Sequence, residues 1–251
     1  MKLSTLLSPA ELPALAQRDL RSTACVVFDI LRATSTFVTA LHRGAQAIQP
    51  VCEIAEANQV RRQQPEVLLA GERCGVKIRA AQPGEFDFDL GNSPREFAPE
   101  VIRGRTIVST TTNGTRALQA CRGAQSVLAG AFLNLAATAH YLKNRPSEEI
   151  LFVCAGTGDG VALEDVLAAG ALADLLAAPQ TQISDATAIA REIYRQEQAD
   201  LLAALSRSQN GRRLLNLPDL AADVAFCAQL NCFEVVASMN PQGRLVRSEN
   251  I

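Results

Sequence analysis

Short apolar runs alternate with longer stretches of helical periodicity along most of the chain. Several of the short runs are apolar at consecutive positions, which is typical of strands buried on both faces. They predict strands at residues 24–30, 45–51, 66–71, 106–110, 125–130 and 150–156. Helical patterns predict helices at residues 34–43, 52–62, 112–120, 134–143 and 162–177. Strand followed by helix, repeated, predicts an α/β fold with mainly parallel sheets flanked by helices.

The rest of the chain departs from this alternation. Two Ser-Pro-x-Glu capping boxes, at residues 8–11 and 93–96, predict helix starts. Residues 76–90 carry Pro, Gly and acidic residues and predict a crossover between two α/β domains, 1–100 and 101–251. After Asp185 the pattern is mainly helical, and residues 232–249 predict a strand, a turn and a final strand.

Composition and charge exclude several classes of protein. Hydrophobic residues make up 48% and charged residues 20%, which allows a sizeable core. The net charge of −2 and the lack of a long Lys/Arg tract argue against a nucleic-acid binder. Seven cysteines without a C-x-x-C pair are typical of a reduced cytoplasmic protein. No apolar stretch reaches the ~18 residues of a membrane span.

Polar residues gather where the predicted strands lead into helices. In parallel α/β sheets, ligands bind beyond the carboxyl ends of the strands. The first junction, FDILRATSTF, carries Asp29 and Arg32 before three hydroxyl residues that open a helix: Thr34, Ser35 and Thr36. The second, AGERCGVKIR, places Glu72 among Arg73, Lys77 and Arg79. A simple buried ion pair between Asp29 and Arg32 would explain part of the first motif equally well.

Two further junctions follow. The stretch IVSTTTNGTRAL is explained either by turn and capping chemistry or by an anion cradle at a helix start. As a cradle, it would use Thr111, Thr112, Gly114, Thr115 and Arg116. The fourth junction, CAGTGDGVALED, delivers Glu164 and Asp165 to the first turn of a helix, where the helix dipole also favours acids.

Together the four junctions offer polar groups of the kinds that a phosphorylated substrate and a metal require. Amide donors, guanidinium groups and Mg²⁺ stabilise the charge that spreads over the phosphoryl oxygens. Mg²⁺ prefers oxygen ligands, and the candidates are Asp29, Glu72, Glu164 and Asp165. One carboxylate would orient or deprotonate the attacking water. Attack by Asp29 itself is the alternative, although the D-x-D of haloacid-dehalogenase phosphatases is lacking.

The motifs VFDILRATSTFVTAL, GERCGVK, FDLGNSP, STTTNGTRAL and CAGTGDGVALED together resemble the 2-phosphosulfolactate phosphatase family. They lie between about residues 26 and 170. The resemblance implies a Mg²⁺-dependent phosphatase that hydrolyses 2-phospho-3-sulfolactate to 3-sulfolactate and phosphate, a step of coenzyme M biosynthesis. It also implies a homodimer and an active site in the cleft between two α/β domains. Cys74, where a glycine is expected, and the loop 78–90 depart from the family pattern.

The residues and the resemblance together give each candidate a role. We expect a catalytic group of Asp29, Arg32, Glu72, Asn113 and Glu164. Phosphate binding is assigned to Thr34, Ser35, Thr36, Thr111, Thr112, Gly114, Thr115 and Arg116, and binding of the substrate's acid groups to Arg73, Lys77, Asn92, Ser93 and Arg95. Two rival functions remain: a phosphatase of another small phosphorylated acid, and a non-catalytic anion-binding module.

Overall fold

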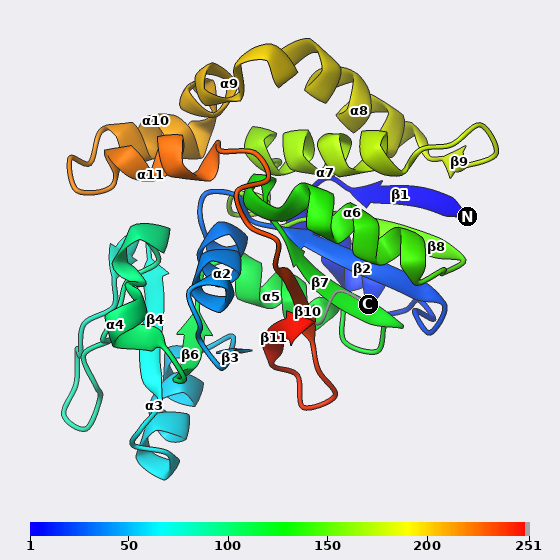
Figure 1. The fold of residues 1–251 in the computed structure, drawn as a ribbon. Coiled ribbons are helices and arrows are strands. Elements are labelled where there is room, and N and C mark those ends of the chain that lie inside the picture. The colour runs from blue at the N-terminus through cyan, green and yellow to red at the C-terminus, as the bar shows by residue number, and fades with distance from the viewer. Residues whose placement is uncertain (249–251) are drawn as a thin grey trace.

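One mixed, mostly parallel sheet of 11 strands forms the centre of the protein and is flanked by helices (Figure 1). The structure is a computed structural model and describes residues 1–248. The strands are β1 (Lys2–Leu6), β2 (Thr23–Phe28), β3 (Ala47–Pro50), β4 (Leu68–Arg73), β5 (Val76–Lys77), β6 (Thr106–Thr110), β7 (Ser126–Gly130), β8 (Glu149–Cys154), β9 (Gln182–Ile183), β10 (Val236–Met239) and β11 (Leu245–Ser248). Their order across the sheet is β5-β4-β6-β3-β11-β10-β7-β2-β8-β1-β9.

The sheet has two parallel parts joined by an antiparallel hairpin. Strands β7, β2, β8, β1 and β9 pair in parallel, as do β4, β6 and β3. The hairpin β10–β11 lies between them, with β10 antiparallel to β7 and β11 antiparallel to β3. In Figure 1, β4 runs nearly vertically and β1 nearly horizontally, so the sheet turns strongly between its two parts.

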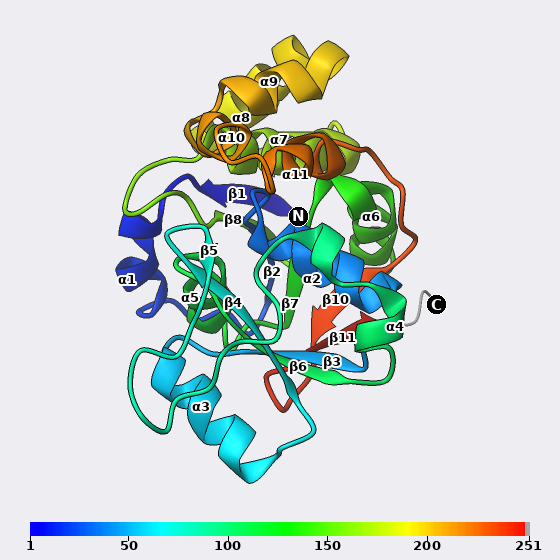
Figure 2. The ribbon, with the colours of Figure 1, turned by 90° about the vertical axis from the view of Figure 1, so that its left-hand side faces the viewer.

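Helices cover both parts of the sheet. They are α1 (Leu12–Leu15), α2 (Ala33–His42), α3 (Ile54–Gln63), α4 (Pro99–Ile102), α5 (Gly114–Ala120), α6 (Leu135–Asn144), α7 (Leu163–Leu176), α8 (Asp185–Glu197), α9 (Leu201–Arg207), α10 (Gln209–Leu215) and α11 (Ala221–Cys227). Helices α8 to α11 form a layer beyond α7, at the top of Figures 1 and 2. Within residues 1–248, no helix combines the length and the apolar character needed to span a bilayer.

Helix α7 packs closely against the rest of the protein. Nearly all of α7 is buried, and Gly170 lies against α8 so closely that a Cβ there would be 2.1 Å from the carbonyl oxygen of Ala190. Only glycine allows this approach, because no real Cβ contact is so short. The first turn of α7, with Glu164 and Asp165, is buried as a result of this packing.

The strand and helix predictions are confirmed at their positions. All six predicted strands correspond to β2, β3, β4, β6, β7 and β8, and the five predicted helices to α2, α3, α5, α6 and α7, with ends shifted by a few residues. Both Ser-Pro-x-Glu motifs begin short 3₁₀ turns, Pro9–Glu11 and Pro94–Glu96. Only the first forms the predicted capping box, because Glu96 accepts a hydrogen bond from the N–H of Gly91 instead. The strand–turn–strand prediction is confirmed by β10 and β11, while its last residue, Glu249, lies outside the described residues.

The sheet also shows what the pattern did not predict. Strand β1 was not predicted, and it pairs with β8 and β9, from far along the chain. Residues 76–90 form the short β5 followed by irregular chain. Strands from both sides of residue 100 alternate in the one sheet. The division into two domains at that residue stays a prediction.

Candidate active site

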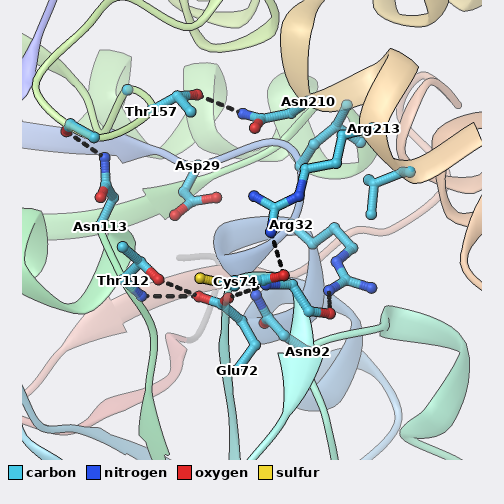
Figure 3. A pocket seen from close by; sticks show the side chains of 15 residues that line it. Asp29, Arg32, Glu72, Cys74, Asn92, Thr112, Asn113, Thr157, Asn210 and Arg213 are labelled. Atoms are coloured by element: carbon cyan, nitrogen blue, oxygen red, sulfur yellow. Dashed lines mark hydrogen bonds between the residues drawn. The ribbon is translucent and has the colours of Figure 1, made fainter. Parts of the chain in front are cut away.

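The loops that follow β2, β4, β6 and β8 line one pocket at the carboxyl ends of these strands, with a cavity volume of about 150 Å³. Each of the four sequence junctions contributes to it. Asp29, Arg32, Glu72 and Asn113, from the first three junctions, line the pocket together with Gly156 and Gly158, from the fourth. Figure 3 shows the side chain of Asp29 facing the same space as those of Glu72 and Asn113. The pocket therefore brings together polar groups that lie far apart in the sequence.

Asp29 directly follows β2 and caps the start of α2. Its Oδ1 accepts a hydrogen bond from the N–H of Ala33 (3.0 Å), and its own N–H donates to Thr34 Oγ1 (2.9 Å). The pKa of this carboxyl group is raised from 3.8 to about 7. Burial is the largest cause, and the charges of Glu72 and Glu164 act in the same direction, while the hydrogen bond from Ala33 and the charge of Arg32 oppose them. A carboxyl group with such a pKa can gain or lose a proton near neutral pH.

Glu72 lies near the end of β4 and is 8% exposed. Its Oε1 accepts hydrogen bonds from both the N–H and the hydroxyl of Thr112, each 2.9 Å, and its Oε2 accepts one from the N–H of Gly75 (2.6 Å). These bonds stabilise the ionised carboxylate and fix its direction. The loops after β4 and β6 are thereby tied together on one side of the pocket.

Asn113 ties the loop after β6 to the loop after β8. Its Nδ2 donates to the carbonyl oxygens of Ala155 (2.7 Å) and Gly158 (3.0 Å). The next residue, Gly114, begins α5 directly beside Asp29, and a Cβ at this position would lie 2.6 Å from Asp29 Oδ2. A side chain at this position would displace the Asp29 carboxylate, so the site requires glycine after Asn113.

Glu164 and Asp165 differ in how their carboxylates are held. Asp165 accepts hydrogen bonds from the N–H groups of Ile30 (2.8 Å) and Gly156 (2.9 Å), one on each oxygen. Its pKa is raised well above the ordinary value, chiefly by burial and then by the charges of Glu164 and Asp29. Glu164 Oε1 accepts from Asn210 (2.7 Å), whereas its Oε2 is buried without a hydrogen-bond partner. A buried carboxylate oxygen without a partner is costly unless a ligand or ion meets it.

Arg32 is 4% exposed and lines the pocket from the start of α2. Its Nη1 donates to Asp223 Oδ2 (2.9 Å) and its Nη2 to the carbonyl oxygen of Gly75 (2.9 Å). Asp223 Oδ1 also accepts from the hydroxyl of Ser93 (2.7 Å). The ion pair that the first motif suggested is therefore made with Asp223, not with Asp29.

The predicted phosphate-binding residues are placed around the pocket, but among them only Thr112 lines it. The hydroxyl of Ser35 donates to Ile30 O (2.8 Å) and that of Thr36 to Asn92 O (2.8 Å). Thr111 and Thr115 bond to each other, Gly114 lies beside Asp29, and Arg116 is exposed. Most of these hydroxyl groups hold backbone, so their proposed contact with phosphate stays a prediction.

Among the residues predicted to bind the substrate's acid groups, only Asn92 lines the pocket. The guanidinium of Arg73 donates to Glu72 O and Thr110 Oγ1, and Lys77 Nζ donates to Asp89 O. Arg95 lies 3.5 Å from Asp223 Oδ1, the same oxygen that accepts the hydrogen bond from Ser93. Lys77 lines a second cavity of about 310 Å³ next to the first, which shares Arg32, Gly75 and Asn92 with it.

Comparison with known proteins identifies the family. The family model for 2-phosphosulpholactate phosphatase matches residues 10–242. The chain belongs to the 2-phosphosulfolactate phosphatase family. It is 40% identical over 253 residues to a probable 2-phosphosulfolactate phosphatase of Synechococcus sp. (strain RCC307), covering 98% of this chain and 99% of that protein. A protein of the same name from Thermosynechococcus vestitus is 38% identical over 244 residues, covering 94% and 95%. One from Carboxydothermus hydrogenoformans is 38% identical over 248 residues, covering 98% and 97%.

In this member of the 2-phosphosulfolactate phosphatase family, the helical layer also supplies pocket residues that the sequence did not single out. Asn210 and Arg213 of α10 line the pocket with Thr157, and Asn210 Nδ2 donates to Thr157 Oγ1 (2.7 Å). Arg213 donates to the carbonyl oxygen of Cys74. The lone aspartate in the apolar run LAADVAF, Asp223, is a sequence signal that could have drawn attention to this layer. An acid in such a run has to find a buried partner.

One residue of the predicted magnesium ligand set, Glu164, has a free carboxylate oxygen. Within residues 1–248, no group of three or more His, Cys, Asp or Glu side chains is close enough to hold a metal ion by itself. Mg²⁺ needs less, because it usually keeps several waters and binds one or two carboxylates together with a substrate phosphate. The buried, unpartnered Oε2 of Glu164 is the atom that best matches such a ligand. The two oxygens of Asp165 already serve backbone N–H groups.

Proposed function

We propose that this protein is a Mg²⁺-dependent phosphatase that hydrolyses 2-phospho-3-sulfolactate to 3-sulfolactate and phosphate. The observation that carries the proposal is the convergence of four strand-end loops on one small pocket with a titratable carboxylate, Asp29, facing it. Membership in the family supports the choice of substrate. The volume of the pocket, about 150 Å³, suits a small substrate.

Cations and amides around the pocket favour an anionic ligand. Arg32 and Arg213 line it, and guanidinium groups bind phosphate with two parallel hydrogen bonds where their geometry allows. The second cavity, which begins at Arg32 and contains Lys77, lies where the acid groups of a longer substrate would extend. In this arrangement the phosphoryl group lies beside Asp29 and the sulfonate and carboxylate groups point away from it.

Asp29 is the base in the proposed reaction. With a pKa of about 7 it is largely ionised at slightly alkaline pH and can take a proton from water. The water oxygen forms a bond to phosphorus as the ester P–O bond breaks, and the released alkoxide of sulfolactate takes up a proton. Attack on phosphorus by Asp29 itself remains the alternative. An acid quench during turnover distinguishes the routes, because only that alternative leaves phosphate bound to the chain.

Magnesium would be held by Glu164 and Glu72. Bound there, it would neutralise charge on the phosphoryl oxygens, a contribution that typically amounts to several kcal/mol in metal-assisted phosphoryl transfer. Glu164 supplies a buried free oxygen for this purpose, and Asn210 keeps its other oxygen in place. Both oxygens of Glu72 already accept bonds from Thr112 and Gly75, so Glu72 would contact the metal through a water.

The test is phosphate release from a panel of small phosphorylated acids, with Mg²⁺ and with Mg²⁺ removed by a chelator. We expect the highest kcat/KM with 2-phospho-3-sulfolactate and loss of activity after chelation that added Mg²⁺ restores. Preference for a different phosphorylated acid would reassign the substrate. Tight binding of phosphosulfolactate without phosphate release over hours would show an anion-binding module instead.

Three further features complete the proposal. All seven cysteines are free, which supports a reducing compartment such as the cytoplasm. A homodimer and a cleft between two domains follow from the family resemblance. Light scattering of the purified protein tests the dimer, and limited proteolysis near residue 100 tests whether the two halves separate.

A further inference from the structure

A buried carboxylate in the helical layer, Asp223, has no part in the mechanism above. It lies in α11, is fully buried, and does not line the pocket. Its Oδ2 accepts a hydrogen bond from Arg32 Nη1 (2.9 Å), and its Oδ1 accepts from Ser93 Oγ (2.7 Å). Arg95, which is 43% exposed, lies 3.5 Å from the same Oδ1. Three segments of the chain thus meet at one carboxylate.

The contact with Arg32 determines how that guanidinium faces the pocket. An arginine side chain has five N–H donors in a rigid fork. Asp223 takes a donor of Nη1 and the carbonyl oxygen of Gly75 takes one of Nη2, so the fork is held at both ends. Its remaining donors are available to a ligand in the pocket that Arg32 lines. Without Asp223, the fork would keep a single anchor.

The contact with Ser93 holds a second part of the pocket wall. Ser93 follows Asn92, which lines the pocket and whose carbonyl oxygen accepts a hydrogen bond from the hydroxyl of Thr36 (2.8 Å). The loop is therefore fixed to α2 on one side and to Asp223 on the other. A change at Asp223 would reach the pocket through Arg32 and through this loop.

Charge adds to the geometric argument. Arg32 and Asp223 are both almost completely removed from water, and such a charge is tolerated only with a paired partner. Removal of the carboxylate would leave the guanidinium buried without compensation, which favours its movement towards water. A bidentate site for an oxyanion depends on donors that are held in place before the ligand arrives.

We propose that Asp223 is a positioning residue that holds Arg32, and with it the loop at Asn92, in the arrangement that binds the phosphoryl group. The inference rests on the proposed function, because it names a residue that acts on the same pocket. Asp223 does not touch the substrate in this proposal. It acts through Arg32, from a helix 191 residues further along the chain.

A double-mutant cycle tests this role. We expect Asp223→Asn to raise KM for 2-phospho-3-sulfolactate at least tenfold with a smaller change in kcat, and Arg32→Lys to lower kcat/KM at least as strongly. In the double variant, kcat/KM should be less than threefold lower than in Arg32→Lys alone, because the residue that Asp223 positions is already changed. Effects that multiply, or a KM unchanged in Asp223→Asn, would overturn the proposal.

A control variant separates the proposed positioning role of Asp223 from the general effect of losing an ion pair. Asp174 on α7 also lies between two arginines, Arg191 (2.8 Å) and Arg195 (2.6 Å) of α8, but it does not line the pocket. Asp174→Asn should leave KM within twofold of the wild-type value. If Asp223→Asn does not fold, the variant Asp223→Glu tests the proposal instead. A carboxylate one methylene longer cannot keep both contacts, so KM should rise at least threefold, and an unchanged KM would overturn the proposal.

Binding of inorganic phosphate distinguishes this inference from the proposed function. Calorimetry of the Mg²⁺-loaded protein should show at least tenfold weaker phosphate binding in Asp223→Asn than in wild type. If the wild type binds phosphate but hydrolyses no substrate in the panel, the proposed function fails and this comparison still decides the role of Asp223. Active wild type with equal phosphate affinity in both proteins would refute the positioning role alone. Wild type that binds no phosphate refutes both.

Discussion

Asn113 Nδ2 lies 2.7 Å from the carbonyl oxygen of Ala155, so a side chain from the loop after β6 holds the backbone at the end of β8. The same nitrogen reaches Gly158 O at 3.0 Å. These two bonds join neighbouring walls of the pocket without a contribution from any charged group. The site therefore depends on a neutral amide for its shape.

Replacing this amide is the first prediction. Asn113→Ala removes both bonds and leaves the carbonyl oxygen of the buried Ala155 without this donor, which should lower the free energy of unfolding by about 1–3 kcal/mol. Turnover should fall more than tenfold, because the loop 156–158 loses its support. Urea denaturation and phosphate release measure the two effects. Asn144→Ala, on the exposed side of α6, is the control and should change neither; wild-type turnover in Asn113→Ala would contradict the prediction.

The raised pKa of Asp29 predicts the pH dependence of activity. If the ionised form acts as base, kcat/KM should increase with pH up to about 7 and level off above it. Asp29→Asn should reduce turnover more than tenfold at every pH and abolish this dependence. The measurement is a pH–rate profile at saturating Mg²⁺. A limb that stays in the profile of Asp29→Asn would assign the titration to another group.

The same shift predicts a pH dependence of stability. The folded-state pKa of Asp29 is raised from 3.8 to about 7, so the folded state binds this proton more tightly than the unfolded state. Below about pH 4 the group is protonated in both states and carries no penalty. Between about pH 4 and pH 7 the unfolded state loses this proton while the folded state keeps it, so stability falls over this range and the full penalty is present above pH 7. Without Mg²⁺, Asp29→Asn should therefore melt at a higher temperature than wild type at pH 8, and this advantage should vanish towards pH 4.

Glu164 should control the magnesium requirement. In Glu164→Gln the amide keeps a carbonyl oxygen for Asn210 but loses the negative charge at the unpartnered position. We expect a more than tenfold loss of turnover and a more than tenfold increase in the Mg²⁺ concentration that gives half-maximal activity. A magnesium titration of phosphate release measures both. Glu192→Gln, an exposed position on α8, should behave as wild type; an unchanged magnesium requirement in Glu164→Gln would remove this residue from the metal site.

Gly114 should tolerate no side chain. In Gly114→Ala the new Cβ would lie 2.6 Å from Asp29 Oδ2 and 2.7 Å from Ala33 Cβ, so the carboxylate or α2 has to move. Overpacking of this kind typically costs about 1–3 kcal/mol of stability, and turnover should fall more than tenfold. Gly160→Ala is the matched control, because its Cβ would meet only Thr157 O at 3.4 Å. Equal activity in both variants would refute the role given to the close contact.

The sequence predicted those parts of the structure that local patterns determine. Strand β2 is buried at all six positions, as its short apolar run predicted for a strand buried on both faces. Because Asp29 directly follows β2 and Glu72 lies at the end of β4, parallel pairing was enough to predict that such residues gather at one edge of the sheet. The pocket contains both.

Tertiary packing decided what the sequence could not. A helical period predicts which face of a segment is apolar, but not which surface that face will cover. It therefore did not predict that Asn210 and Arg213 line the pocket or that Asp223 binds Arg32. The hydroxyl residues after β2 show a related limit. Residue type suggested a phosphate cradle, whereas Ser35 and Thr36 use their hydroxyl groups to hold backbone carbonyls.

The position of the hairpin β10–β11 in the sequence also affects how the sheet folds during synthesis. Strands β10 and β11 provide the link across the sheet between β7 and β3, yet they are translated after every other strand of this sheet. Until they leave the ribosome, the two parallel parts lack this link and keep strand edges open to other nascent chains. Closure of the sheet consequently waits for residues 236–248, and a premature stop codon shortly before Val236 would release a chain without the hairpin that joins the two parts.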